Sequence, residues 1–282
     1  MGEARKKSNS RAAILSAATR CIYCANIPDT IEHMPPRSLF ASKMRPSGLE
    51  FPACKQCNGA TRGADTTASL FAWLGRSDYQ VSFWRGAEGQ RILYSAEKDA
   101  PGVRDEIFHD PRPKNLWLPE QNGLLTRRVQ VDVNGPLAKA YLDIFSAKLG
   151  MAFYYEHVGR PLELKGGVRT QWFLNSGLSE AYAQVMLQIL PRGSTLRQGT
   201  FQVPDQFFYR YNCDNKSIFA ALVSLRGNLH ISVVATSEPE KFGIGHDTVR
   251  NLVGAGYMRP GGLVEALPRA KVHPTFAPIW AG

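Results

Sequence analysis

The spacing of apolar residues predicts regular elements in the second half of the chain. Residues 137–155 carry apolar side chains every three to four positions, which is the spacing of one helix face. Residues 179–190 show a second amphipathic pattern, which begins at a serine and ends before a proline. Three apolar runs separated by short turns predict a three-stranded antiparallel meander, at residues 207–211, 218–225 and 229–235.

The patterns elsewhere are shorter. Residues 66–74 are compatible with a helix, and residues 124–133 alternate like a strand. Two short apolar runs around a Gly-Ala-Glu-Gly turn predict two strands, at residues 81–84 and 91–94. Segments rich in Pro, Gly, Asp and Asn predict a long loop and an irregular tail, at residues 98–123 and from residue 254 onward.

These elements predict an α+β fold with an antiparallel sheet. A chain of 282 residues allows one large domain or two of ordinary size. The change in pattern near residue 80 predicts a division into an N-terminal tail, a first module and an α+β domain, at residues 1–17, 18–80 and 81–282. The sequence leaves open whether the last domain regulates, binds a partner or extends a DNA contact.

Charge points toward a polyanionic partner and away from the membrane. The net charge is +10, and cationic side chains bind nucleic acid because neutralised phosphates release their counterions. Residues 1–80 hold eleven Lys and Arg and six Asp and Glu. Half of the net positive charge therefore lies in this part of the chain. No apolar stretch approaches the roughly 18–20 residues of a membrane span. The apolar run after the basic start is too short for a signal peptide, so we expect a basic tail, a short helix and a cytoplasmic protein.

Four of the five cysteines form two C-x-x-C pairs, Cys21 with Cys24 and Cys54 with Cys57. Each pair places two sulfurs on one side of a turn, and two such turns complete a tetrahedral zinc site with no open position, which is a structural site. Two disulfides would need an oxidising compartment, and a redox motif would need only one pair. The fifth, Cys213, has no partner in sequence and is expected to be an inert thiol.

An acid and an imidazole stand side by side between the cysteine pairs. Glu32 and His33 are followed by Pro36, three residues after the histidine, and Asn58 follows the last cysteine. Imidazole can deprotonate water near neutral pH. Carboxylate and amide oxygens are ligands for a hard divalent cation that stabilises a phosphate transition state. Glu32, His33 and Asn58 are therefore candidate catalytic residues.

The order C-x-x-C, then acid-His-x-x-Pro, then C-x-x-C-Asn resembles the zinc-containing HNH, or ββα-metal, endonucleases over residues 21–74. The segment Glu-His-Met-Pro-Pro-Arg-Ser-Leu-Phe, residues 32–40, is similar to the corresponding segment of bacterial HNH proteins with an uncharacterised C-terminal region. The resemblance implies a treble-clef or ββα-metal module in which His33 is the general base and Glu32 and Asn58 hold catalytic Mg²⁺ or Mn²⁺. The chain departs from many relatives in having Glu rather than Asp before the histidine, and Thr61 and Arg62 after the asparagine.

Basic residues near this motif are expected to bind DNA phosphates without reading bases. They are Arg37, Lys43, Arg45, Lys55 and Arg62. Asp65, about two helical turns after Asn58, is either a solvated residue or a distant metal ligand.

Two functions follow from these patterns. The first is a metal-dependent endonuclease that nicks or cuts double-stranded DNA with low intrinsic sequence specificity. The second is a non-catalytic zinc module that binds nucleic acid or protein. By analogy with HNH proteins that carry an extra domain, the first function would serve phage defence or a mobile element, and a regulatory protein partner would gate it.

Overall fold

The computed structural model describes residues 11–74, 81–108, 114–119, 125–130, 135–174, 180–245 and 255–268. They form a mixed α+β fold that contains an antiparallel sheet, as the sequence predicts. Residues 1–10, which make up most of the predicted basic tail, lie outside the described part, and residues 11–16 form a short helix. Within the described part, no helix is both long enough and apolar enough to cross a membrane.

The N-terminal part is a small hairpin followed by helices. Strands β1 (Thr30–His33) and β2 (Glu50–Ala53) pair antiparallel. The chain between them forms two 3-10 turns, η1 (Arg37–Leu39) and η2 (Ala41–Lys43). After β2 come α2 (Lys55–Ala60) and α3 (Arg62–Leu74). Helix α3 includes the predicted helix at residues 66–74 but starts earlier, and almost all of its side chains are buried.

The middle of the chain is helical where the sequence predicted strands. Residues 81–84 lie in α4 (Val81–Arg85), and residues 91–94 lie in α5 (Ala87–Asp99). The predicted turn is wrong because Gly86 caps α5 and Gly89 lies inside it, where a Cβ would stand 2.4 Å from the Phe83 carbonyl oxygen. The buried pair Ile92 and Ala96 has helical spacing, which a four-residue window does not reveal.

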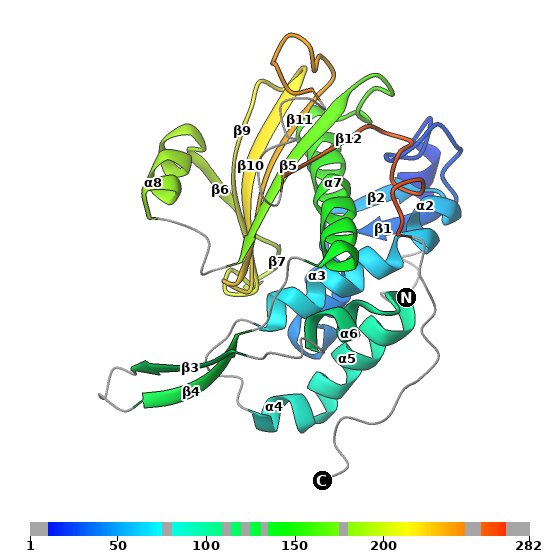
Figure 1. The fold of residues 1–282 in the computed structure, drawn as a ribbon. Helices are drawn as coiled ribbons and strands as arrows, with labels where there is room; N and C mark the ends of the chain where they lie inside the picture. Colours follow the sequence, from blue (N-terminus) through cyan, green and yellow to red (C-terminus); the bar gives the residue numbers. More distant parts are fainter. Residues whose placement is uncertain are drawn as a thin grey trace.

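The predicted loop at residues 98–123 is also partly wrong. It contains α6 (Val103–Phe108) and β3 (Lys114–Pro119), and the rest of its centre lies outside the described residues. The predicted strand at residues 124–133 is confirmed as β4 (Leu125–Gln130), which pairs antiparallel with β3. This β3–β4 hairpin extends away from the body of the molecule (Figure 1).

The second half of the chain follows the sequence pattern closely. The two predicted helices are confirmed as α7 (Pro136–Val158) and α8 (Glu180–Ile189). The predicted meander is confirmed as β9 (Phe207–Cys213), β10 (Ile218–Leu225) and β11 (Leu229–Thr236). Buried and partly exposed positions alternate along β10 and β11, so one face of these strands is buried.

The meander belongs to a larger sheet. Six strands stand in the order β12-β5-β11-β10-β9-β6, with β5 (Gly167–Leu174), β6 (Arg192–Ser194) and β12 (Ala255–Met258) added to the meander. Strand β12 lies in the tail that was predicted to be irregular, and most of that tail lies outside the described residues. A small hairpin of β7 (Arg197–Gln198) and β8 (Phe201–Gln202) completes the described strands.

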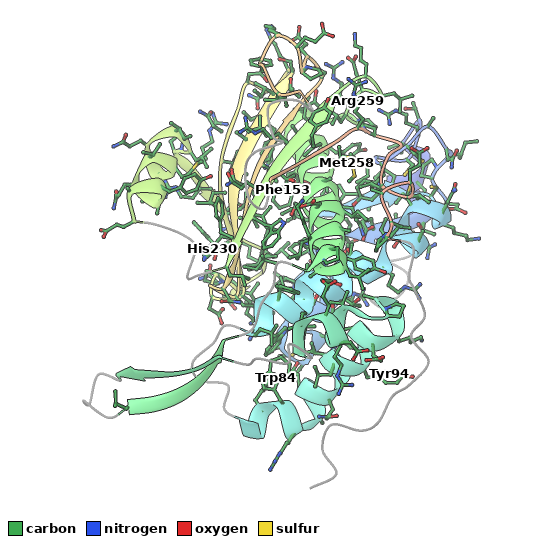
Figure 2. All side chains as sticks on the ribbon, in the orientation of Figure 1. Trp84, Tyr94, Phe153, His230, Met258 and Arg259 are labelled. Carbon is green, nitrogen blue, oxygen red and sulfur yellow. The ribbon has the colours of Figure 1, made fainter. Side chains whose placement is uncertain are left out.

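Helix α7 lies between the sheet and the N-terminal helices (Figure 1). Tyr94 of α5 is exposed at the surface, whereas Phe153 of α7 is buried (Figure 2). On one side of α7, Phe153 packs against Phe207, Tyr209 and Phe219 of the sheet. On its other side α7 packs against α3.

The packing is continuous across the predicted boundary at residue 80. The Asn228 side chain donates to the Phe71 carbonyl oxygen at 2.7 Å, and the Gly261 amide donates to the Tyr23 carbonyl oxygen at 2.7 Å. The N-terminal hairpin therefore sits on a core that the later chain supplies.

Candidate metal centre and the two faces of the hairpin

The four paired cysteines meet at one point. The sulfurs of Cys21, Cys24, Cys54 and Cys57 all lie within 4.8 Å of one another, and none of them is in a disulfide. Among the residues that the structure describes, they are the one group of three or more Cys, His, Asp or Glu side chains placed to hold a metal ion. Four thiols at this spacing fit a zinc-like ion, which their thiolates would surround completely.

Backbone amides already point at these sulfurs. The amides of Tyr23, Asn26 and Cys57 donate to Cys21 Sγ, Cys24 Sγ and Cys54 Sγ at 3.3–3.4 Å. Hydrogen bonds within the cluster, first the one from Cys57, lower the pKa of Cys21 to about 5. Burial and sharing of protons raise the pKa values of Cys24 and Cys57 instead. One thiolate therefore forms readily, and a bound cation would replace the protons on the other sulfurs.

Two residues that the sequence did not single out hold the cysteine turns in place. Arg20 donates to the carbonyl oxygens of Cys21 and Cys24 at 3.2 Å, and also to that of Leu162 in the second half of the chain. Asp29, in the loop before β1, accepts from the Lys55 amide at 2.7 Å, where α2 begins. These bonds connect the first cysteine turn to the core and the β1 loop to the second turn.

One face of the β1–β2 hairpin is open to solvent. His33 ends β1 and stands opposite Glu50 in the strand register, and both side chains are a little under one-third exposed. The distance from His33 Nδ1 to Glu50 Oε1 is 3.6 Å, and an Arg37 guanidinium nitrogen lies 3.4 Å from His33 Nε2. Partial burial, and then the charges of Arg45 and Arg37, lower the pKa of His33 to about 4. The imidazole is therefore neutral at pH 7, and it is a weaker base than a free imidazole.

The other face of the same strand is closed. Glu32 precedes His33 and points inward, because successive side chains of a strand alternate. Its carboxylate is 3.2 Å from the ammonium of Lys148, which α7 supplies and which has no exposed surface. The same ammonium donates to both oxygens of Asp65 on α3, at 2.7 and 2.8 Å. Asp65 is thus buried and ion-paired, so the prediction of a solvated residue is wrong.

Burial governs the charges of this cluster. Burial raises the pKa of Glu32 to about 7, although Lys148 opposes the shift, and it also raises the pKa of Asp65. Burial alone would lower the pKa of Lys148, but the two carboxylates outweigh it and leave that pKa raised. The ammonium is therefore charged, and two acids share it.

The predicted divalent-ion ligands do not fit a divalent ion as they are placed here. Glu32 is directed at Lys148 and is about 3% exposed. Asn58, at the end of α2 nearest β1, uses its amide nitrogen to donate to Thr30 Oγ1 and to the Ile31 carbonyl oxygen, both at 3.2 Å. Glu32 is thus part of a buried ion cluster, and the hydrogen bonds of Asn58 hold α2 against β1.

The five basic residues expected at phosphates divide into two kinds. Arg45 is turned inward and donates to five backbone carbonyl oxygens of its own loop, a role other than the predicted phosphate contact. Burial lowers the pKa of Arg45 to about 10. Lys55 is exposed and lies 3.7 Å from Asp29. The other three are exposed to solvent: Arg37, Lys43 and Arg62.

The loop that carries Arg37 and Lys43 is fastened from outside the hairpin. The Ser42 amide donates to Glu88 of α5 at 2.7 Å, and the Ala41 amide donates to Gln206 at 2.8 Å. Arg226, in the turn between β10 and β11, stacks on Trp73 and donates to the Leu39 carbonyl oxygen. The later chain therefore holds the loop beside His33 in position.

Comparison with known proteins adds no family to this description. No family model matches the chain, and no curated protein and no solved structure matches it. The resemblance to HNH endonucleases therefore rests on the motif at residues 21–74. The structure itself shows a four-cysteine cluster that could hold a zinc-like ion at the base of the hairpin.

Proposed function

We propose that the protein is an endonuclease that hydrolyses phosphodiester bonds of double-stranded DNA, with His33 as general base. The observation that carries the proposal is the arrangement on the open face of the hairpin. A neutral, partly exposed imidazole lies between a carboxylate, Glu50, and a guanidinium, Arg37. A base, an orienting acid and a phosphate-binding cation are three parts that phosphodiester hydrolysis uses.

Each of the three side chains has one role in this reaction. Glu50 faces Nδ1 and favours the tautomer in which Nε2 is the acceptor, and the Arg37 guanidinium that now faces Nε2 at 3.4 Å must turn from it to the phosphate. Nε2 takes a proton from water, the resulting hydroxide attacks phosphorus, and the bond from phosphorus to the 3′ oxygen breaks as that oxygen takes a proton from solvent. Arg37 binds a non-bridging phosphate oxygen and offsets the charge that develops there. These contacts read phosphates and not bases, so we expect low sequence specificity.

Zinc is the metal that we propose for the cysteine cluster, and the treble-clef or ββα-metal arrangement is the fold that we propose for this module. Four thiolates leave zinc no position for water, so the ion is structural. It fixes the start of β1 relative to the end of β2, and hence His33 relative to Glu50. We assign no step to a divalent ion held by Glu32 and Asn58, because these side chains make other contacts.

Plasmid cleavage tests the proposal. Supercoiled DNA is incubated with the zinc-loaded wild type, with His33→Gln and with the matched control His230→Gln, whose histidine lies on β11 of the large sheet. Reactions run in metal-free buffer and with added Mg²⁺ or Mn²⁺. We expect His33→Gln to lose at least about 100-fold of the rate, within the usual contribution of a general base, and His230→Gln to retain it. Equal cleavage by wild type and His33→Gln would show that His33 is not the base.

A second candidate is a zinc module that binds DNA without cutting it. The observation that favours it is the Glu32–Lys148 pair, which leaves the motif without the acid that the resemblance assigns to a metal. DNA binding by fluorescence anisotropy, together with intact plasmid in every buffer, would support this candidate over the nuclease.

A further inference from the structure

We propose that Lys148 is the resident cation of the Glu32–Asp65 site, so that this chain binds no divalent ion there and removal of the ammonium creates a divalent-cation site. The proposal concerns the closed face of the hairpin. It does not depend on the activity proposed for His33.

The geometry around the ammonium is that of a small coordination shell. Three carboxylate oxygens from two elements converge on Lys148 Nζ: Asp65 Oδ1 at 2.7 Å, Asp65 Oδ2 at 2.8 Å and Glu32 Oε2 at 3.2 Å. Oxygens of metal sites stand closer, at about 2.0–2.1 Å for Mg²⁺ and about 2.3–2.6 Å for Ca²⁺. The observed distances suit an ammonium, and the converging oxygens would need to move inward by about 0.6–1.2 Å to reach the distances of a Mg²⁺ site.

Lys148 comes from a distant part of the chain and cannot leave the site easily. It projects from α7, which packs against α3, and its side chain has no exposed surface. The flanking segment of α7, residues 144–154, is buried throughout, and the ammonium lies 5.8 Å from the centre of the Tyr23 ring. A divalent ion could replace the ammonium only by displacing this fully buried side chain from between α7 and α3.

The charges favour one cation at this point. Glu32 and Asp65 are both buried, and two carboxylates so close to one centre repel each other unless a cation or a proton lies between them. Lys148 supplies one positive charge, so no cation from solution is needed between the two carboxylates. When Lys148 is replaced by alanine, the carboxylates keep their places on β1 and α3, and the space of the lysine side chain becomes available to an ion and its waters.

Binding of Mn²⁺ to zinc-loaded protein, measured by electron paramagnetic resonance, tests the proposal. We expect no Mn²⁺ binding by the wild type that depends on Glu32. We expect Lys148→Ala to bind one Mn²⁺ per chain, at least about tenfold more tightly than the wild type, and its unfolding midpoint to rise with Mn²⁺. The matched control is Lys139→Ala on the same helix, which removes the cation from a single, mostly buried carboxylate, Asp143, and should bind none.

Two results would overturn the proposal. One is Mn²⁺ binding by the wild type that Glu32→Gln abolishes, a measurement that does not depend on the folding of a lysine variant. The other is a folded Lys148→Ala that gains neither Mn²⁺ binding nor stabilisation. Since the readout is ion binding and not cleavage, failure here leaves the role of His33 intact, and an inactive His33 leaves the role of Lys148 intact.

Discussion

The two faces of the β1–β2 hairpin place adjacent residues in opposite environments. His33 faces solvent beside Arg37 and Glu50, whereas Glu32, one residue earlier, lies in the core beside Lys148 and Asp65. Burial acts on both residues in the same physical direction, against the charged form. It lowers the pKa of His33 to about 4 and raises that of Glu32 to about 7.

The difference lies in what else each face provides. The open face leaves a neutral base beside an exposed guanidinium, Arg37, and both groups can be reached by a ligand from solution. The closed face supplies its own cation, so its charges are satisfied internally and contribute to folding instead. Glu32 and His33 are neighbours in sequence, but side chains alternate along a strand, so they lie on opposite faces. His33 is therefore a candidate reactive residue, and Glu32 is a structural one.

Loss of the metal should have the largest effect, because both faces depend on the cysteine cluster beneath them. We expect Cys57→Ser, or removal of the ion by a chelator, to unfold the hairpin, since structural zinc in small finger peptides is worth about 10–16 kcal/mol of apparent binding free energy. Elemental analysis should give one zinc per chain in the wild type, and urea unfolding should show the loss of stability. Cys213→Ser is the control, since Cys213 lies on β9 away from the cluster. Two disulfides in the purified protein would contradict the assignment.

The parts of this region that the sequence predicted are those that depend on local spacing. Two C-x-x-C turns predict a four-sulfur cluster, and the meander and α7 follow from apolar patterns sustained over many residues. The strands predicted at residues 81–84 and 91–94 were wrong because four residues do not distinguish a strand from one turn of a buried helix. Glu50 was missed because its position opposite His33 depends on the register of the hairpin.

The partners of the closed face depend on tertiary contacts. Lys148 is 83 residues from Asp65 in sequence, and no spacing rule connects them. One signal was present: Lys148 stands in a helix that continues as Leu-Gly-Met-Ala-Phe-Tyr-Tyr, so a charge there needed a buried partner. Arg45 likewise donates to five carbonyl oxygens of its own loop, and only the folded loop shows that they converge on it.

Breaking the closed face should have the next largest effect. Lys148→Met leaves two buried carboxylates without a cation, which should cost about 3–5 kcal/mol of unfolding free energy at pH 7.5. The cost should be smaller at pH 5, because the acids can then take up protons. Lys139→Met on the same helix breaks a partly exposed pair with Asp143 and should cost less than about 1 kcal/mol. If Lys148→Met and Lys139→Met lose the same unfolding free energy in urea, the buried ion cluster does not stabilise the fold more than the partly exposed pair does.

The pH dependence of stability isolates Glu32. Its pKa in the folded protein, about 7, lies above the ordinary value of 4.5, so its contribution is most favourable below pH 4.5 and is lost as the pH rises through 7. Between pH 4.5 and pH 8, Glu32→Gln should therefore lose less stability than the wild type, by at most about 3 kcal/mol. Titration of His33, which has the opposite sign, is present in both proteins and cancels in the comparison. Parallel stability profiles would contradict the raised pKa.

The two arginines of the connecting loop give the smallest and most selective contrast. Arg45→Met removes a charged donor from five carbonyl oxygens, so we expect a loss of about 2 kcal/mol of unfolding free energy. Arg37→Met removes an exposed side chain and should change stability by less than about 0.5 kcal/mol. DNA affinity should respond the other way, because only Arg37 is placed to bind a phosphate. Titrations at several salt concentrations should show a slope smaller by about one for Arg37→Met. If Arg37→Met loses stability and keeps its salt slope, Arg37 is a structural residue like Arg45, and the open face has no phosphate-binding cation beside its base.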